Sequence, residues 1–205
     1  MLKGMARGRK TLKITLDNNC LISLDNDDED SSIIRQIVGL QTSKKAQVFV
    51  PAIAASENKQ GNKQYANFRE FEEFLRKIGC DDCHALDPLA YADVTYLNHC
   101  VLDPSELEEP IHRILFPRIP FKYADYRRFC GIVPNENVLD RKWRNAKCDV
   151  LAMWCHIHYG NDAFITNDRN FHKVTKKPRL IGLGAKEILR PREVLNKFLY
   201  NHSTY

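Results

Sequence analysis

Short apolar runs alternate with longer amphipathic stretches along most of the chain. Buried strands are predicted from the short β-rich runs at 11–16, 47–50, 163–166 and 179–183. Helices are predicted where apolar residues recur at helical spacing, over 31–43, 65–78, 139–159 and 193–199, with Pro191 opening the last. This alternation favours a three-layer α/β/α sandwich around a central parallel sheet.

Residues 87–140 do not follow that alternation, because six prolines divide them into short pieces. They hold two further predicted helices, over 103–115 and 121–129, and no second core of domain size. We therefore expect one domain over 11–205 with an elaboration at about 87–140. Residues 1–10 are expected to be a basic, flexible tail.

Composition indicates an ordinary globular protein, with 43% apolar and 28% charged residues. No apolar run approaches the ~20 residues that a membrane helix needs, so we expect no membrane partner. The basic segment 1–10 has no apolar stretch behind it, and the seven cysteines have no disulfide-framework spacing. Reduced thiols and a cytoplasmic location are the expectation, and the net charge of +5 favours a polyanionic partner.

Four acidic residues far apart in sequence are expected at one edge of the sheet. Asp17 follows the strand 11–16 and Asp168 follows the strand 163–166. Glu57 is expected near the start of a helix that begins at Pro51, and Asp149 borders the apolar stripe of the helix 139–159. Singly, Asp17 could be a helix or turn cap and Glu57 a glutamate that complements a helix dipole.

Together, four unpaired carboxylates would repel one another and raise one another's pKa unless cations neutralise them. Hard oxygen ligands favour one or two Mg²⁺ or Mn²⁺ ions over Zn²⁺. Two such ions ~4 Å apart would activate water for hydrolysis of a phosphodiester.

Two basic clusters are candidates for binding the flanking phosphates: Arg141, Lys142 and Arg144, and Lys173, Lys176 and Lys177. The first lies within the basic segment 141–147, whose Trp143 suits base stacking, although a solvated helix start explains it equally well.

Other motifs carry weaker signals. The acid run 25–30 lacks the glycine and glutamate of an EF-hand loop. Cys80-Asp-Asp-Cys-His84 matches both haem-attachment and redox patterns, but ordinary thiols at the start of a strand are the favoured interpretation. An aspartyl phosphatase is rejected because Asn19 stands where its second aspartate would be.

Four ordered segments resemble the successive motifs of PIN-domain ribonucleases: Leu16-Asp-Asn-Asn-Cys-Leu-Ile22, Val50-Pro-Ala-Ile-Ala-Ala-Ser-Glu57, Asp149-Val-Leu-Ala152 and Ile165-Thr-Asn-Asp-Arg-Asn-Phe171. The resemblance implies Mg²⁺- or Mn²⁺-dependent endonucleolytic cleavage of single-stranded RNA, leaving 5′-phosphate and 3′-hydroxyl ends. It places Asp17, Glu57, Asp149 and Asp168 on the family's catalytic, metal-binding positions. It places Asn19 and Thr166 on the supporting polar positions.

Many members of that family are toxins of toxin–antitoxin pairs, so the resemblance also implies an antitoxin or another regulatory protein as partner. A homodimer is an open alternative. Two departures stand out: Asn170 occupies a position where many members have a further acid, and the elaboration at 87–140 exceeds the usual toxins. Two alternatives remain open, a non-catalytic RNA-binding or regulatory domain and a structure-specific DNA nuclease.

Overall fold

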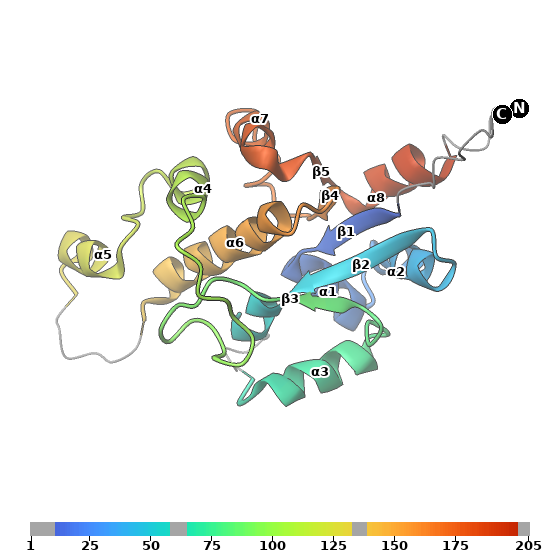
Figure 1. The fold of residues 1–205 in the computed structure, drawn as a ribbon, viewed down its shortest axis with the longest axis horizontal. Helices are drawn as coiled ribbons and strands as arrows, with labels where there is room; N and C mark the ends of the chain where they lie inside the picture. The colour runs from blue at the N-terminus through green and yellow to red at the C-terminus, as the bar shows by residue number, and fades with distance from the viewer. Residues whose placement is uncertain (1–10, 58–64, 133–138, 201–205) are drawn as a thin grey trace, which may run out of the picture.

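The computed structural model describes residues 11–57, 65–132 and 139–200 (Figure 1). The basic tail expected over 1–10 lies outside these ranges. Five parallel strands form one sheet in the order β3-β2-β1-β4-β5. The strands are β1 (Leu12–Leu16), β2 (Ala46–Pro51), β3 (His84–Leu86), β4 (Ala163–Ile165) and β5 (Glu187–Leu189).

Helices lie on both faces of this sheet. The α-helices are α1 (Asn18–Asn26), α2 (Ser31–Thr42), α3 (Phe68–Lys77), α4 (Glu108–Leu115), α5 (Tyr123–Cys130), α6 (Arg141–His158), α7 (Lys177–Leu180) and α8 (Pro191–Val194). Three helical turns of other pitch are η1 (Ala52–Ser56), η2 (Ile181–Ala185) and η3 (Leu195–Tyr200). The predicted three-layer α/β/α architecture is confirmed.

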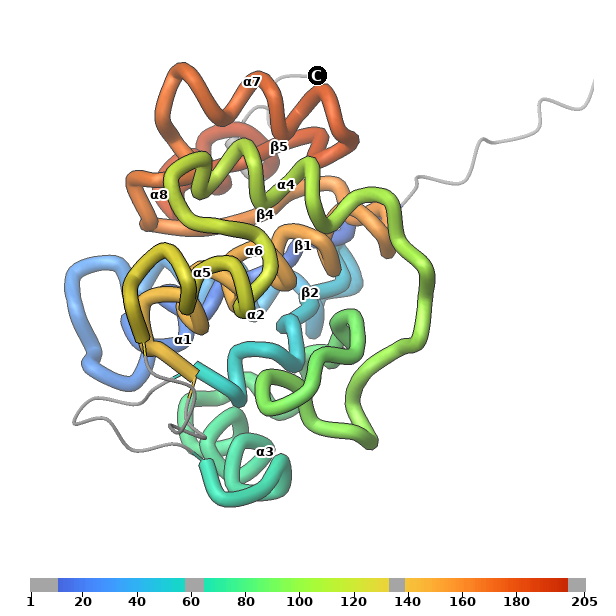
Figure 2. Tube along the Cα trace, turned by 90° about the vertical axis from the view of Figure 1, so that its left-hand side faces the viewer, coloured from blue at the N-terminus to red at the C-terminus, as the bar shows by residue number. Residues whose placement is uncertain are grey.

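Two hydrophobic cores follow from the alternation of side chains along the strands. Ile14, Leu16 and Val48 belong to the core under α1, α2, α3 and α8. Phe164 and Ile188 point the other way, into the core under α4 and α6. Figure 1 shows α3 on the side of the edge strand β3, and both views show α7 and α8 near β5 (Figures 1 and 2).

The strand order places a topological switch point at β1. The chain adds β2 and then β3 on one side of β1, and later adds β4 and β5 on the other. Ile14 accordingly pairs with Val48 of β2 and with Ala163 of β4. In open parallel sheets, ligands bind beyond the carboxyl ends of the strands at such a point.

Most predicted elements are present, with shifted ends. The helix expected over 65–78 begins at Phe68, where the side chain of Asn67 accepts a hydrogen bond from the Glu70 amide. The helices expected over 103–115 and 121–129 are the shorter α4 and α5. Helix α1 was not predicted, because its apolar residues are few and interrupted by polar ones.

Two predictions were wrong. Glu57 does not lie on a helix starting at Pro51, since Pro51 ends β2 and the short turn η1 ends before Glu57, whose backbone is extended. The strand expected over 179–183 is absent, because Pro178 lies in the first turn of the short helix α7 and the helical turn η2 follows it. The last strand is β5, a few residues later.

Candidate functional site

Asp17 is the residue around which the candidate site is built. It leaves the carboxyl end of the central strand β1 and has only 4% of its surface exposed. One carboxylate oxygen, Oδ1, accepts the Asn18 amide at 2.8 Å and so begins α1. The other, Oδ2, accepts from Asn19 Nδ2 and from Thr166 Oγ1, both at 2.6 Å. Asp17 is therefore a helix cap and a buried, fixed acid at the same time.

Thr166 connects the carboxyl ends of β1 and β4. Its hydroxyl donates to Asp17 and accepts from Asn19 Nδ2 at 2.8 Å and from the Asp168 amide at 3.0 Å. Asp168 turns the chain at this point, since its Oδ1 accepts the Asn170 amide at 2.8 Å. These bonds place the Asp168 backbone next to Asp17, although the two residues are far apart in sequence.

Glu57 reaches the same edge from the end of β2. Its Oε2 accepts a hydrogen bond of 2.6 Å from Asn18 Nδ2, which ties the segment after η1 to the first turn of α1. Asp149 approaches from α6, half-buried between the buried residues Cys148 and Val150. The structure thus brings all four predicted acids to one end of the sheet.

The acids are close enough to change one another's protonation. Burial, with repulsion from Asp168, raises the pKa of Asp17 to about 6 against the hydrogen bonds that lower it. Burial, and then repulsion from Asp17 and Asp168, raises the pKa of Glu57 to about 8. Burial, and then repulsion from Glu57, Asp17 and Asp168, raises the pKa of Asp149 well above its usual range. Every pair among the four therefore interacts.

The chemistry of this donor set fits a divalent cation, because four clustered carboxylates offer hard oxygen ligands and carry uncompensated negative charge. The arrangement is not yet a closed coordination shell. Within 11–57, 65–132 and 139–200, no three His, Cys, Asp or Glu side chains are close enough to form a ready-made metal site. Mutual repulsion and the Asn18 bond to Glu57 both oppose closer approach of the carboxylates.

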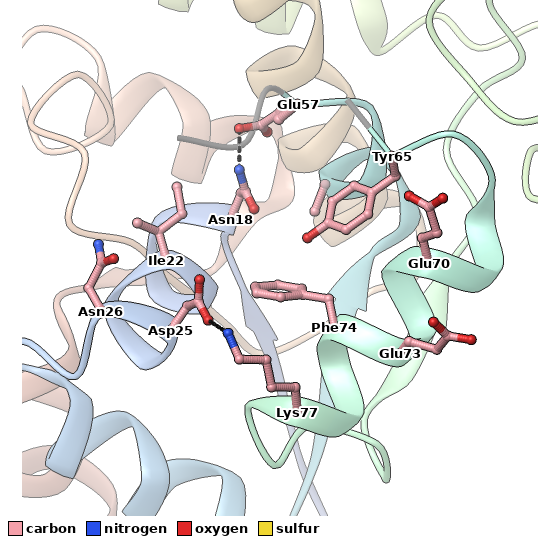
Figure 3. A pocket seen from close by; sticks show the side chains of 11 residues that line it. Asn18, Ile22, Asp25, Asn26, Glu57, Tyr65, Glu70, Glu73, Phe74 and Lys77 are labelled. Carbon is pink, nitrogen blue, oxygen red and sulfur yellow. Dashed lines mark hydrogen bonds and ion pairs between the residues drawn. The ribbon is translucent and has the colours of Figure 1, made fainter. Parts of the chain in front are cut away.

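A pocket of about 560 Å³ opens beside Glu57, between α1 and α3 (Figure 3). Ile22 lies on one side, with Tyr65 and Phe74 facing it. Its rim is acidic, and the Asp25 carboxylate accepts from Lys77 Nζ at 2.7 Å. Glu57 is therefore accessible from this side of the molecule.

The predicted basic clusters are only partly available for substrate. Arg141 and Lys142 are exposed at the start of α6, and Arg144 is half-buried, with its Nε lacking a hydrogen-bond partner among the described residues. Lys173 is exposed and Lys177 is half-buried.

Three basic or aromatic residues point inward instead. Lys176 donates to the Leu115 carbonyl and to Asn170, so its ammonium group is already bound. Trp143 is fully buried and donates to the Pro120 carbonyl, which excludes the base-stacking role considered for it. Lys147, within the basic segment 141–147, is buried in an ion pair with Glu108 among aromatic rings.

Asn18 is the contact that sequence reasoning missed. The only sequence feature that could indicate this role is the triplet Asp17-Asn18-Asn19. The sequence predicts a supporting role there for Asn19, whose amide binds Asp17, and none for Asn18. Asn167 makes a further contact that was not predicted. Its backbone N–H donates to Asn19 Oδ1 at 2.9 Å and fixes that side chain.

None of the helices in the described part of the chain is both long and apolar enough to cross a membrane. Comparison of the whole sequence with models of protein families, with curated proteins and with solved structures finds no match to any of them.

Proposed function

We propose that this protein is a metal-dependent endoribonuclease of the PIN-domain type, which hydrolyses phosphodiester bonds in single-stranded RNA. The observation that carries the proposal is the convergence of Asp17, Glu57, Asp149 and Asp168 at one sheet edge, with every pair coupled electrostatically. Such a cluster lowers the stability of the folded state through mutual repulsion, and a bound cation would offset that repulsion.

The four carboxylates would hold Mg²⁺ or Mn²⁺, which when bound supplies Lewis-acid polarisation of a phosphoryl oxygen. Asp17 would be the most fixed ligand, because Asn19 and Thr166 each hold its Oδ2 at 2.6 Å. Asp168 and Glu57 are the candidates to orient the attacking water, since both follow the ends of strands, and Glu57 also lines the pocket between α1 and α3. Glu57 must first exchange its hydrogen bond with Asn18.

Exposed basic side chains on the elements that carry Asp149 and Asp168 support an anionic substrate. Arg141 and Lys142 begin α6, the helix of Asp149, and Lys173 lies five residues after Asp168 in the sequence. Phosphate contacts of this kind would position the strand without reading its sequence, leaving the scissile phosphate over the acids.

The test is cleavage of single-stranded RNA in Mn²⁺ by the wild type, Asp17→Asn and Asp168→Asn. The matched control is Asp162→Asn, an acid at the opposite, amino end of β4, where it accepts the Lys13 amide and Lys186 Nζ. We expect the wild type and the control to cleave, and both site variants to lose activity by about 10²-fold or more.

Sequencing of RNA ends after induction in cells extends the test to natural substrates. New 5′-phosphate ends should appear with the wild type and not with Asp168→Asn, and growth arrest under the same comparison would support the toxin role. Equal cleavage by Asp168→Asn would overturn the proposal. RNA binding without cleavage would identify a non-catalytic domain, and a preference for branched DNA would identify a DNA nuclease.

A further inference from the structure

A second cluster of reactive side chains lies at the turn between α3 and β3. Gly79 ends α3 with a positive φ of 76°, and the Cys80 amide returns to the Leu75 carbonyl at 2.8 Å. The Cys83 amide then donates to the Cys80 carbonyl at 3.1 Å, which closes a four-residue turn. This backbone bond fixes the separation of the two cysteines.

Both cysteines of the turn pack against the same hydrophobic core. Cys80 is fully buried in the core under α1 and α2, and Cys83 is partly exposed and packs against the same core. Interaction with the neighbouring thiol lowers the pKa of Cys80 and raises that of Cys83. Arg35 also favours the Cys80 thiolate. The pair therefore has one sulfur suited to carry charge and one that solvent can reach.

The turn also has the span that a disulfide requires. Residues one and four of a closed turn have Cα atoms less than about 7 Å apart, and disulfide-bonded cysteines have Cα atoms about 4.4–6.8 Å apart. The backbone of the turn therefore already holds the two Cα atoms within the range of a disulfide.

We propose that Cys80 and Cys83 form a redox-active dithiol that exchanges with low-molecular-weight disulfides such as glutathione disulfide. The Cys80 thiolate takes the proton of Cys83, the accessible sulfur, which then attacks one sulfur of the external disulfide and releases a thiolate. That thiolate takes the proton back from Cys80 and leaves as the first thiol. Cys80 then attacks the Cys83 sulfur of the mixed disulfide and releases a second thiolate, which takes a proton from solvent. The protein dithiol is oxidised by two electrons and the external disulfide is reduced to two thiols.

The link would join the end of α3 to the start of β3. Helix α3 contributes Phe74 and Lys77 to the pocket beside Glu57, and β3 pairs with β2, which leads to Glu57. Oxidation would therefore fix the wall of that pocket. The proposal does not depend on nuclease activity, because it concerns only sulfur chemistry at the turn between α3 and β3.

The experiment incubates the full-length protein, without denaturant, in glutathione buffers of increasing oxidised fraction, followed by acid quenching, alkylation and peptide mass spectrometry. We expect the Cys80–Cys83 peptide to lose two hydrogens reversibly. The linked form should exceed the glutathione adduct at Cys83 by about tenfold or more, because the second thiol acts intramolecularly.

Two variants provide the controls. Cys83→Ser should abolish the linked species and leave the buried Cys80 unmodified, whereas Cys130→Ser, at an exposed cysteine, should leave the linkage unchanged. A stable glutathione adduct at Cys83 in the wild type with no link to Cys80 would overturn the proposal. A link between Cys80 and the neighbouring buried Cys20 would equally overturn it.

Discussion

At the scale of single residues, the site is defined by hydrogen bonds that hold buried charge in place. Asn19 and Thr166 both donate to the same oxygen of Asp17, and Asn167 fixes the Asn19 amide in turn. The remaining acids have fewer such partners. Repulsion at the edge of the sheet is therefore only partly offset, and this predicts a cost in stability.

Removal of one of these charges should stabilise the cation-free protein. In EDTA, Asp149→Asn is expected to raise Tm, because burial and three neighbouring acids disfavour the Asp149 carboxylate. Each ~1 kcal/mol gained raises Tm by about 2–4 °C in a chain of this size. Calorimetry should show no comparable gain for Glu106→Gln at an exposed acid. With Mn²⁺ present the advantage should vanish, because the cation stabilises the wild type. A lower Tm for Asp149→Asn in EDTA would contradict this account.

His156 gives the protein a dependence on acid pH. It is fully buried; its Nε2 donates to the Ala185 carbonyl at 2.8 Å, so in the neutral ring its Nδ1 accepts from Thr15 Oγ1 at 3.0 Å. Burial lowers its pKa from 6.5 to about 4, with Lys186 acting in the same direction and Asp162 opposing it. The folded state therefore binds the proton more weakly than the unfolded chain. Its contribution to stability is complete above pH 6.5 and is lost as the pH falls toward 4.

The lost stability amounts to about 3 kcal/mol over that range. The measurement is the free energy of unfolding of the wild type and of His156→Gln at several pH values. Groups that titrate alike in both proteins cancel when the two free energies are subtracted at each pH. We expect the advantage of the wild type to shrink between pH 7 and pH 4.5. A constant difference would mean that His156 does not titrate as described.

At the scale of elements, prediction succeeded where the apolar pattern was long or strongly β-branched. The strand 11–16, the helix 31–43 and the helix 139–159 are present as β1, α2 and α6. Prediction failed where a short apolar run is compatible with both a strand and a helix. Residues 179–183 suit a strand by composition, yet the preceding proline lies in the first turn of a helix and Gly184 ends it with a φ of 111°.

The turn η2 therefore offers a matched pair of glycines. Gly184→Ala should destabilise the protein by about 1–3 kcal/mol, because its φ is unfavourable for a residue with a Cβ atom. The new Cβ would also lie 3.4 Å from the Ile157 side chain. Gly182→Ala is the control, since it has an ordinary φ and open space, and it should be neutral or stabilising by up to ~1 kcal/mol. Urea unfolding of the two variants decides, and equal losses would refute the role assigned to Gly184.

At the scale of the whole molecule, the candidate site combines acids and cations drawn from across the sequence. The four acids could be predicted because three follow recognisable strands and the fourth borders a clear apolar stripe. The contact of Asn18 with Glu57 could not be predicted, because it depends on where the extended segment after η1 lies. The inward direction of Trp143 and Lys147 could not be predicted either, because α4 and the loop after it bury them.

Electrostatic binding of RNA should therefore rely on the cations that remain exposed. Replacing the exposed Arg141 and Lys142 by alanine is expected to weaken binding to all RNA sequences alike and to reduce the slope of log K against log salt by about 1–2. The control replaces Lys44 and Lys45, two exposed lysines that precede β2 at the opposite end of the sheet. Filter binding at several salt concentrations measures both. If the slope is unchanged in the tested variant, or changes equally in the Lys44 and Lys45 variant, RNA does not bind at the tested residues.

The strand order has a consequence for biosynthesis. Because β4 pairs with β1 only after the chain has passed residue 165, a nascent polypeptide on the ribosome carries Asp17 and Glu57 long before Asp168 can join them. If the protein has the proposed nuclease activity, an emerging chain would lack the assembled acid cluster, and hydrolysis could begin only after Asp168 has been synthesised. Late assembly of this kind would be a safeguard that requires no inhibitor.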